Sequence, residues 1–189
     1  MASELAYVFW HWPRSDVSIR SYERKLGSFQ SALMSSKPLG LTAALSYRVD
    51  SLPWGPKGRP LYEDWYAVEG FADLGVLNDA AVAEGVKGFH DAVARDYMKG
   101  AGGLFKLIHG GLPLREARYA TWIEKPVGPP YKSYYEELAE RIGNKRTDLW
   151  RRQMVLGPSA QFCIHSREAV DFPKTLRPFT SKVKVAVSS

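Results

Sequence analysis

The stretch "AYVFWHWP", Ala6–Pro13, decides the fold because a related stretch, "YATWIE", begins at Tyr119. Its dense aromatic side chains predict a β-strand over Ala6–Trp12 that ends at Pro13. With the second half of the chain placed under the first at a shift of 112 residues, five positions are identical: Tyr7 and Tyr119, Trp10 and Trp122, Ser21 and Ser133, Tyr22 and Tyr134, Leu26 and Leu138. The chain therefore contains an internal repeat.

The first repeat has the predicted element order β-α-β-β-α-β. Apolar spacing predicts a helix from about Asp16 to Lys37-Pro38, followed by strands over Leu41–Val49 and Leu61–Glu69. A second helix is expected to begin at Asn78-Asp79, and "GLFKLIHG" is expected to form the fourth strand after a helix cap at Gly100. The buried stripes are predicted to be Tyr22, Leu26, Phe29 and Leu33 in the first helix, and Val82, Val86, Phe89, Val93 and Tyr97 in the second.

The second repeat begins in the same way but is shorter. Its predicted elements are a strand over Arg118–Glu124, a helix over Tyr131–Ile142, strands over Leu149–Leu156 and Ala160–His165, and a short last strand over Val183–Val187. Only "REAVDFPKTLRP", with an internal proline, stands where a second helix belongs. We therefore expect an α+β chain of two repeats, residues 1–112 and 113–189, packed as one globular unit, the second lacking a full second helix.

Two ferredoxin-like repeats in this order resemble the dimeric α/β barrel superfamily, here fused into one pseudo-dimeric chain. The resemblance covers nearly the whole length and depends on element order. It implies a pocket between each half-sheet and its helices or loops. Relatives in the superfamily include cofactorless monooxygenases, haem-binding chlorite dismutase relatives, muconolactone-type isomerases and stress-response proteins, so the resemblance implies no common chemistry.

Composition restricts the partners and the location of the chain. Cys163 is its single cysteine, so no internal disulfide forms, and no apolar run is long enough for a membrane helix. Without a secretory signal pattern, a cytoplasmic protein is expected. The net charge of +6 lies largely in two basic clusters: Arg141, Lys145, Arg146, Arg151 and Arg152, then Lys174, Arg177, Lys182 and Lys184. These clusters favour anionic partners or form a solvated basic face.

His11 gives the clearest functional signal. Strand alternation places it on one face with Tyr7 and Phe9, and the repeat has Ile123 in its position. The packing shared by both repeats therefore does not require a histidine there. We predict His11 to be a catalytic base, donor or haem ligand, with Tyr7 and Phe9 binding the ligand; a surface hydrogen bond is the alternative.

Five further residues complete the predicted site. On the strand "LYEDWYAVEG", Asp64 and Tyr66 are candidates for acid–base catalysis, and Arg48 on the neighbouring strand is a candidate ligand contact; a cross-strand ion pair of Arg48 is the alternative. Trp54 belongs to the loop "PWGPKGRP", which could close over the pocket. His109, at the end of the fourth strand, is the reserve ligand-binding residue. No metal site is predicted, because the histidines lack metal-ligand spacing.

These residues favour a small-molecule-binding barrel with its pocket in the first repeat. Whether it is an enzyme stays open: oxidative or isomerising chemistry on an aromatic or apolar substrate, without a cofactor or with haem, is what the resemblance implies. A nucleic-acid or anion-binding module using the basic clusters is the alternative, although no stretch matches the RNP1 pattern. A homo-oligomer remains open, and no membrane partner is expected.

Overall fold

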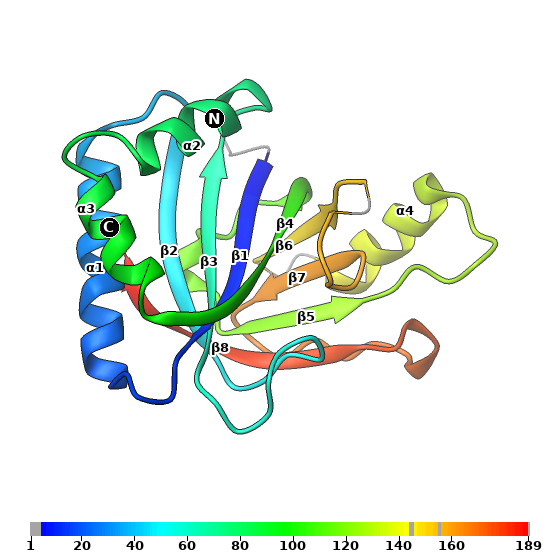
Figure 1. Ribbon diagram of the computed structural model, residues 1–189. Coiled ribbons are helices and arrows are strands. Elements are labelled where there is room, and N and C mark those ends of the chain that lie inside the picture. Colours follow the sequence, from blue (N-terminus) through cyan, green and yellow to red (C-terminus); the bar gives the residue numbers. More distant parts are fainter. Residues whose placement is uncertain (1–4, 144–145, 155, 189) are drawn as a thin grey trace.

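The eight strands form one closed barrel (Figure 1), in a computed structural model that describes residues 5–143, 146–154 and 156–188. The order around the barrel is β1-β3-β2-β8-β5-β7-β6-β4, and every neighbouring pair of strands is antiparallel. The strands are β1 (Leu5–Pro13), β2 (Leu41–Val49), β3 (Leu61–Val68), β4 (Tyr97–Gly110), β5 (Tyr119–Ile123), β6 (Thr147–Arg152), β7 (Phe162–Ser166) and β8 (Phe179–Ser188).

The barrel consists of two four-stranded halves with the same strand order. The N-terminal half is ordered β4-β1-β3-β2 and the C-terminal half β8-β5-β7-β6, which is the ferredoxin-like arrangement repeated. The halves join where β2 pairs with β8 and where β4 pairs with β6. This order confirms the predicted pseudo-dimeric α+β barrel.

Helices cover the outer faces of the two halves unequally (Figure 1). The helices α1 (Ile19–Ser35), α2 (Ala72–Ala81) and α3 (Lys87–Ala94) lie on the N-terminal half, whereas α4 (Tyr131–Ile142) lies on the C-terminal half. The short 3-10 helices are η1 (Leu114–Glu116) and η2 (Lys174–Leu176). Among its described residues the second half thus has no second α-helix, as predicted, and its outer core is completed by Val170, Phe172 and Leu176. No helix in the described ranges is both long and apolar enough to cross a membrane.

Aromatic side chains fill the interior of the barrel. Trp10, Trp65, Trp122 and Trp150 are each at most 2% exposed and belong to one hydrophobic cluster. Alternation along each strand directs these side chains inward while their neighbours face the helices. The recurrence of Trp10 and Trp122 in the sequence therefore marks the barrel core.

The predicted second helix is wrong in its details. Two short helices, α2 and α3, replace it, and Asn78-Asp79 lies inside α2 instead of capping a helix. Val82 is 49% exposed and Phe89 is 45% exposed, whereas Val86 is buried. The chain breaks the helix after Ala81, so the continuous apolar stripe expected from the sequence does not form.

The fourth strand begins earlier than predicted. β4 starts at Tyr97, and Gly100 lies within it instead of capping a helix. A Cβ atom at Gly100 would lie 2.2 Å from the Phe9 ring, and one at Gly102 would lie 2.8 Å from the Tyr7 hydroxyl oxygen. These positions have no room for a side chain, because rings from β1 lie directly against the β4 backbone.

Candidate functional site

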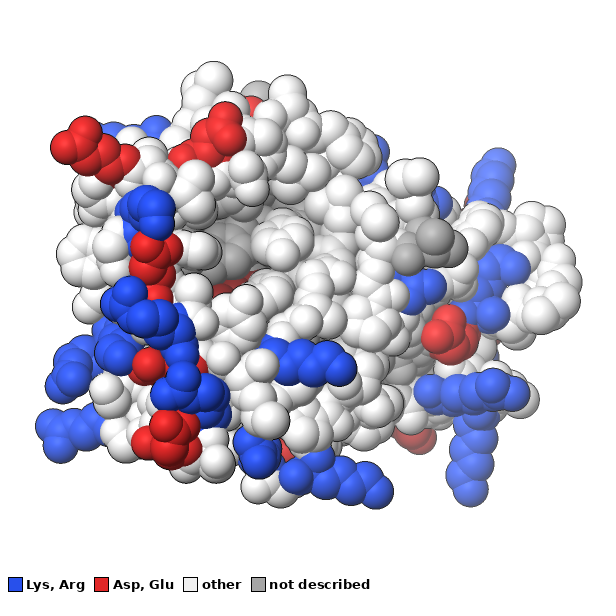
Figure 2. Space-filling model, in the orientation of Figure 1, with Lys and Arg blue, Asp and Glu red and all other residues white. Residues whose placement is uncertain are grey.

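A cavity of about 670 Å³ lies between the outer face of the N-terminal half-sheet and its helices. Its lining side chains come from β1, β3, β4 and from α1, α2 and α3, and Leu156 from the C-terminal half reaches its edge. Figure 2 shows the molecule hollowed between the helices and the barrel, with mostly uncharged residues around the opening. The cavity is thus a largely apolar pocket of the size that small-molecule ligands require.

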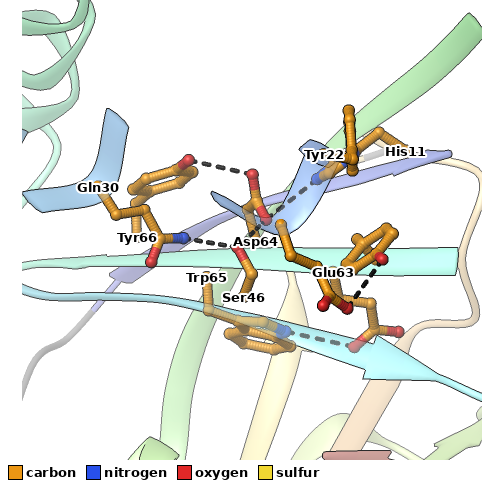
Figure 3. A network of polar contacts seen from close by, with 10 residues as sticks. His11, Tyr22, Gln30, Ser46, Glu63, Asp64, Trp65 and Tyr66 are labelled. Carbon is orange, nitrogen blue, oxygen red and sulfur yellow. Dashed lines mark hydrogen bonds and ion pairs between the residues drawn. The ribbon is translucent and has the colours of Figure 1, made fainter. Parts of the chain in front are cut away.

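One carboxylate lies at the polar end of this pocket. Asp64 is 3% exposed; it accepts a hydrogen bond from the Tyr66 hydroxyl at 3.1 Å and another from the Ser46 hydroxyl. The Gln30 amide donates to the Ser46 oxygen at 2.6 Å, and His11 Nε2 lies 3.0 Å from the Asp64 carboxylate. Figure 3 shows Asp64 and Tyr66 on one side of β3 and Trp65 on the other. We call His11, Gln30, Ser46, Asp64 and Tyr66 the Asp64 cluster.

The neighbours of His11 define its tautomer. Burial raises the pKa of Tyr22, so its hydroxyl stays protonated and donates to His11 Nδ1 at 2.6 Å. Neutral His11 then carries its proton on Nε2, the nitrogen beside Asp64. That N–H is not aligned for a good hydrogen bond with the carboxylate, although His11 Nε2 lies only 3.0 Å from it. The N–H dipole of His11 therefore lies beside the Asp64 carboxylate and stabilises its negative charge.

The described residues of the C-terminal half contain no such cluster. At the shift of 112 residues, His11 corresponds to Ile123 and Gln30 to Ile142. The strand pairings place Asp64 opposite Phe9 and Ser46, and Ile164 opposite Thr121 and Leu149. The four counterparts are aliphatic and fully buried: Ile123, Ile142, Leu149 and Ile164. Because one half folds with an aliphatic cluster in these positions, the barrel itself does not require the polar one.

Aromatic rings form the wall beside the cluster. The Tyr7 and Phe9 rings lie 6.5 Å apart with 17° between their planes, and Tyr66 lies 6.3 Å from Tyr7 at 24°. Burial, followed by the nearby Asp64 charge, raises the pKa of Tyr7. Nearly parallel rings in an apolar pocket favour a planar ligand.

The structure brings five predicted site residues together and separates three. His11, Asp64, Tyr66, Tyr7 and Phe9 all line the pocket. Arg48 lies outside it, 47% exposed, with its guanidinium 3.9 Å from Glu23. Trp54 packs against Trp10 and Trp122 at ring distances of 5.3 and 5.0 Å, so its loop contacts the barrel interior. His109 is exposed at the end of β4 and does not line the pocket.

The surroundings of the histidines predicted as haem ligands leave little room for that role. Nδ1 of His11 is hydrogen-bonded to Tyr22, and Nε2, although it has no aligned hydrogen bond, lies 3.0 Å from the Asp64 carboxylate, which stands where an iron atom would bind. His109 lies outside the pocket. Within the described residues, no group of three or more His, Cys, Asp or Glu side chains could hold a metal ion.

A second histidine that sequence analysis did not select lines the same pocket. His90 of α3 lies at its wall, and its ring meets Phe29 edge-on at 5.5 Å. The sequence contained the signal: Val86, His90 and Val93 follow helical spacing, but the prediction gave this face to Phe89.

The outer-face aromatics of the N-terminal half-sheet lie beneath helices, so they form no exposed platform for stacking nucleic-acid bases.

Comparisons with known proteins agree with the architecture. No family model matches the chain, and neither does any curated protein. A candidate monooxygenase from Fusobacterium nucleatum subsp. nucleatum ATCC 25586 has a similar structure, with a TM-score of 0.66 and 9% identity over 100% of this chain and 94% of that chain. A candidate monooxygenase from Lactobacillus acidophilus NCFM has a TM-score of 0.61 and 9% identity over 98% of both chains. A candidate chlorite dismutase has a TM-score of 0.57 and 11% identity over 97% of this chain and 95% of that chain. The chain therefore has the dimeric α+β barrel fold, with both halves of the barrel in one polypeptide.

Proposed function

We propose that the protein is an enzyme that binds a small planar ring compound in the N-terminal pocket and removes a proton from it with Asp64. The observation that carries this proposal is the difference between the two halves of the barrel. The N-terminal half buries His11, Gln30, Ser46 and Asp64 where the C-terminal half buries four aliphatic side chains. Burial of a carboxylate and its partners costs free energy that an aliphatic cluster avoids. Such a cost, at the end of an apolar pocket, is typical of a functional site.

The proposed step is proton abstraction next to a carbonyl group. The C–H bond of the ligand breaks, its proton passes to a carboxylate oxygen of Asp64, and the electron pair remains on the ligand as an enolate. Once Asp64 is protonated it becomes a weaker acceptor, which frees the Tyr66 hydroxyl to donate to the enolate oxygen. The raised pKa of Tyr66, caused by burial and by the Asp64 charge, keeps that hydroxyl protonated.

His11 is a positioning residue in this scheme. Its Nδ1 is occupied by Tyr22, and its Nε2 faces Asp64 instead of the open pocket. It therefore acts through the carboxylate, holding its orientation and stabilising its charge. The aromatic wall of Tyr7 and Phe9 orients the ring of the ligand.

Two reaction classes share this first step. Return of the proton to a different carbon gives an isomerisation, whereas transfer of electrons from the enolate to dioxygen gives an oxidation. The similarity in fold to candidate monooxygenases supports the oxidative branch. The Asp64 carboxylate, 3.0 Å from His11 Nε2, supports a reaction in which this histidine holds no haem.

The proposal is tested with 2-tetralone, a ketone with acidic C–H groups whose carbonyl ring is fused to a planar benzene ring. Its binding is measured by calorimetry, and its exchange of hydrogen for deuterium in D₂O by NMR. We expect His11→Ala to lower the exchange rate at least tenfold, whereas Ile123→Ala, the matched truncation in the other half, leaves both binding and exchange unchanged. If His11→Ala retained full affinity and full exchange, His11 would have no part in the site.

A further inference from the structure

Helix α3 places a histidine among the largely apolar side chains of the pocket wall. His90 lines the cavity with Val93 and the adjacent Phe89 does not, although the two side chains are similarly exposed, 40% for His90 and 45% for Phe89. The pocket wall that α3 contributes therefore carries a polar ring where the other side chains of the helix wall are mostly apolar.

The ring of His90 is held in place on both sides. Its Nδ1 lies 3.3 Å from the Asp91 carboxylate, which also accepts a hydrogen bond from Lys87. Phe29 contacts the ring edge-on. Because a carboxylate only accepts hydrogen bonds, Nδ1 carries the proton of the neutral ring and Nε2 has a lone pair. No side chain within the described ranges hydrogen-bonds to that Nε2.

His90 therefore differs from His11 in its chemistry. Nδ1 of His11 is hydrogen-bonded to Tyr22 and its Nε2 faces the Asp64 carboxylate, whereas His90 keeps one nitrogen for a molecule in the pocket. His90 belongs to the helical wall, whereas Asp64 belongs to the strand β3 that forms the floor. A ligand between them meets an acid–base group at the sheet and a hydrogen-bond acceptor at the helices.

We propose that His90 determines ligand specificity by accepting a hydrogen bond from a hydroxyl group on the part of the ring compound remote from Asp64. This inference rests on the proposed function, because it assumes that the reactive carbonyl group lies at Asp64. It deepens that function by requiring a ligand with a reactive group at one end and a hydrogen-bond donor at the other.

The test compares 2-tetralone with 6-hydroxy-2-tetralone, which carries one added hydroxyl on the far ring. The variant His90→Phe keeps an aromatic ring against Phe29 and removes the acceptor nitrogen. We expect it to weaken binding of the hydroxylated compound about tenfold and to change binding of 2-tetralone less than about twofold, the difference that one hydrogen bond to a charged or well-placed group makes. Phe89→Ala, on the solvent side of the same helix, is the matched control and should change neither.

Each outcome separates the two proposals. If His90→Phe weakened the binding of both compounds equally, or of neither, His90 would have no role in specificity. The hydrogen–deuterium exchange of 2-tetralone would then still test the role of Asp64 on its own. If the wild-type protein bound neither compound, the proposed function and this inference would both be wrong. The melting temperature of His90→Phe shows whether folding has changed, and a purely structural role would not alter the ratio of the two affinities.

Discussion

Exchange of the Asp64 cluster for its aliphatic counterparts should separate stability from function. The variant combines His11→Ile, Gln30→Ile, Ser46→Leu and Asp64→Ile, so that the N-terminal half receives the residues that the C-terminal half uses. Tyr22 then loses its partner at His11. In the C-terminal half the equivalent Tyr134 donates instead to the Glu124 backbone oxygen at 3.3 Å, which shows how that hydroxyl is accommodated.

The magnitude follows from what each change leaves behind. Asp64→Ile alone leaves the Ser46 and Tyr66 hydroxyls and the His11 N–H buried without the carboxylate. Removing one member of a buried polar group in this way lowers the unfolding free energy by about 3–5 kcal/mol. The fourfold variant removes the stranded donors on His11 and Ser46 as well and replaces them with packed apolar groups. Exchange of a buried polar network for hydrophobic residues is neutral or stabilises by about 1–4 kcal/mol, and of the cluster only the Tyr66 hydroxyl remains here without its acceptor. We therefore expect the single variant to be less stable than wild type and the fourfold variant to be at least as stable.

The assay is urea unfolding, which gives the free energy of unfolding and its dependence on denaturant for all three proteins. The fourfold variant should also have lost catalysed exchange of 2-tetralone. A fourfold variant less stable than Asp64→Ile alone would refute the reasoning, because it would show that the polar cluster holds the fold together.

Further predictions concern buried charge and backbone space. Burial raises the pKa of Glu63 from its ordinary 4.5 to about 7, so the folded state binds more protons between these values and the unfolding free energy falls as pH rises through this window. Glu63→Gln removes that fall, and the difference between its urea-unfolding curve against pH and that of wild type measures it. His165 acts in the opposite sense: burial lowers its pKa to about 3, so stability is lost as pH falls below about 6.5, and His165→Phe should keep more of its unfolding free energy at pH 4. Gly100→Ala should cost about 2 kcal/mol by forcing the Phe9 ring to move, whereas Gly75→Ala, in an open position of α2, should stabilise by about 0.5–1 kcal/mol; urea midpoints of both test this.

Much of the fold could be predicted from periodicity and repetition. The alternation of β1 and of Leu61–Val68 sorted their residues correctly into two faces, and the absence of a histidine at Ile123 identified His11 as exceptional. Both inferences depend on local patterns and on one internal comparison, which a sequence provides directly.

The remainder of the site depends on contacts that no local pattern encodes. Gln30 and Ser46 come from two other elements and join Asp64 only when α1 packs on the sheet. Arg48 is close in sequence to Ser46, but it extends to Glu23 and away from the pocket. His90 was missed because apolar periodicity assigned Phe89 to the buried face, and the structure reverses that assignment.

The most direct test of the central claim is the rate at which 2-tetralone exchanges hydrogen for deuterium, measured by NMR with wild-type protein and with Asp64→Asn. Asparagine retains the shape of the side chain and removes its basicity. The account predicts exchange well above the rate in buffer for the wild type, and a loss of about 10²-fold or more in the variant, as removal of a general base causes. Equal exchange rates in the two proteins would contradict it, since the Asp64 carboxylate would then take no proton from the ligand.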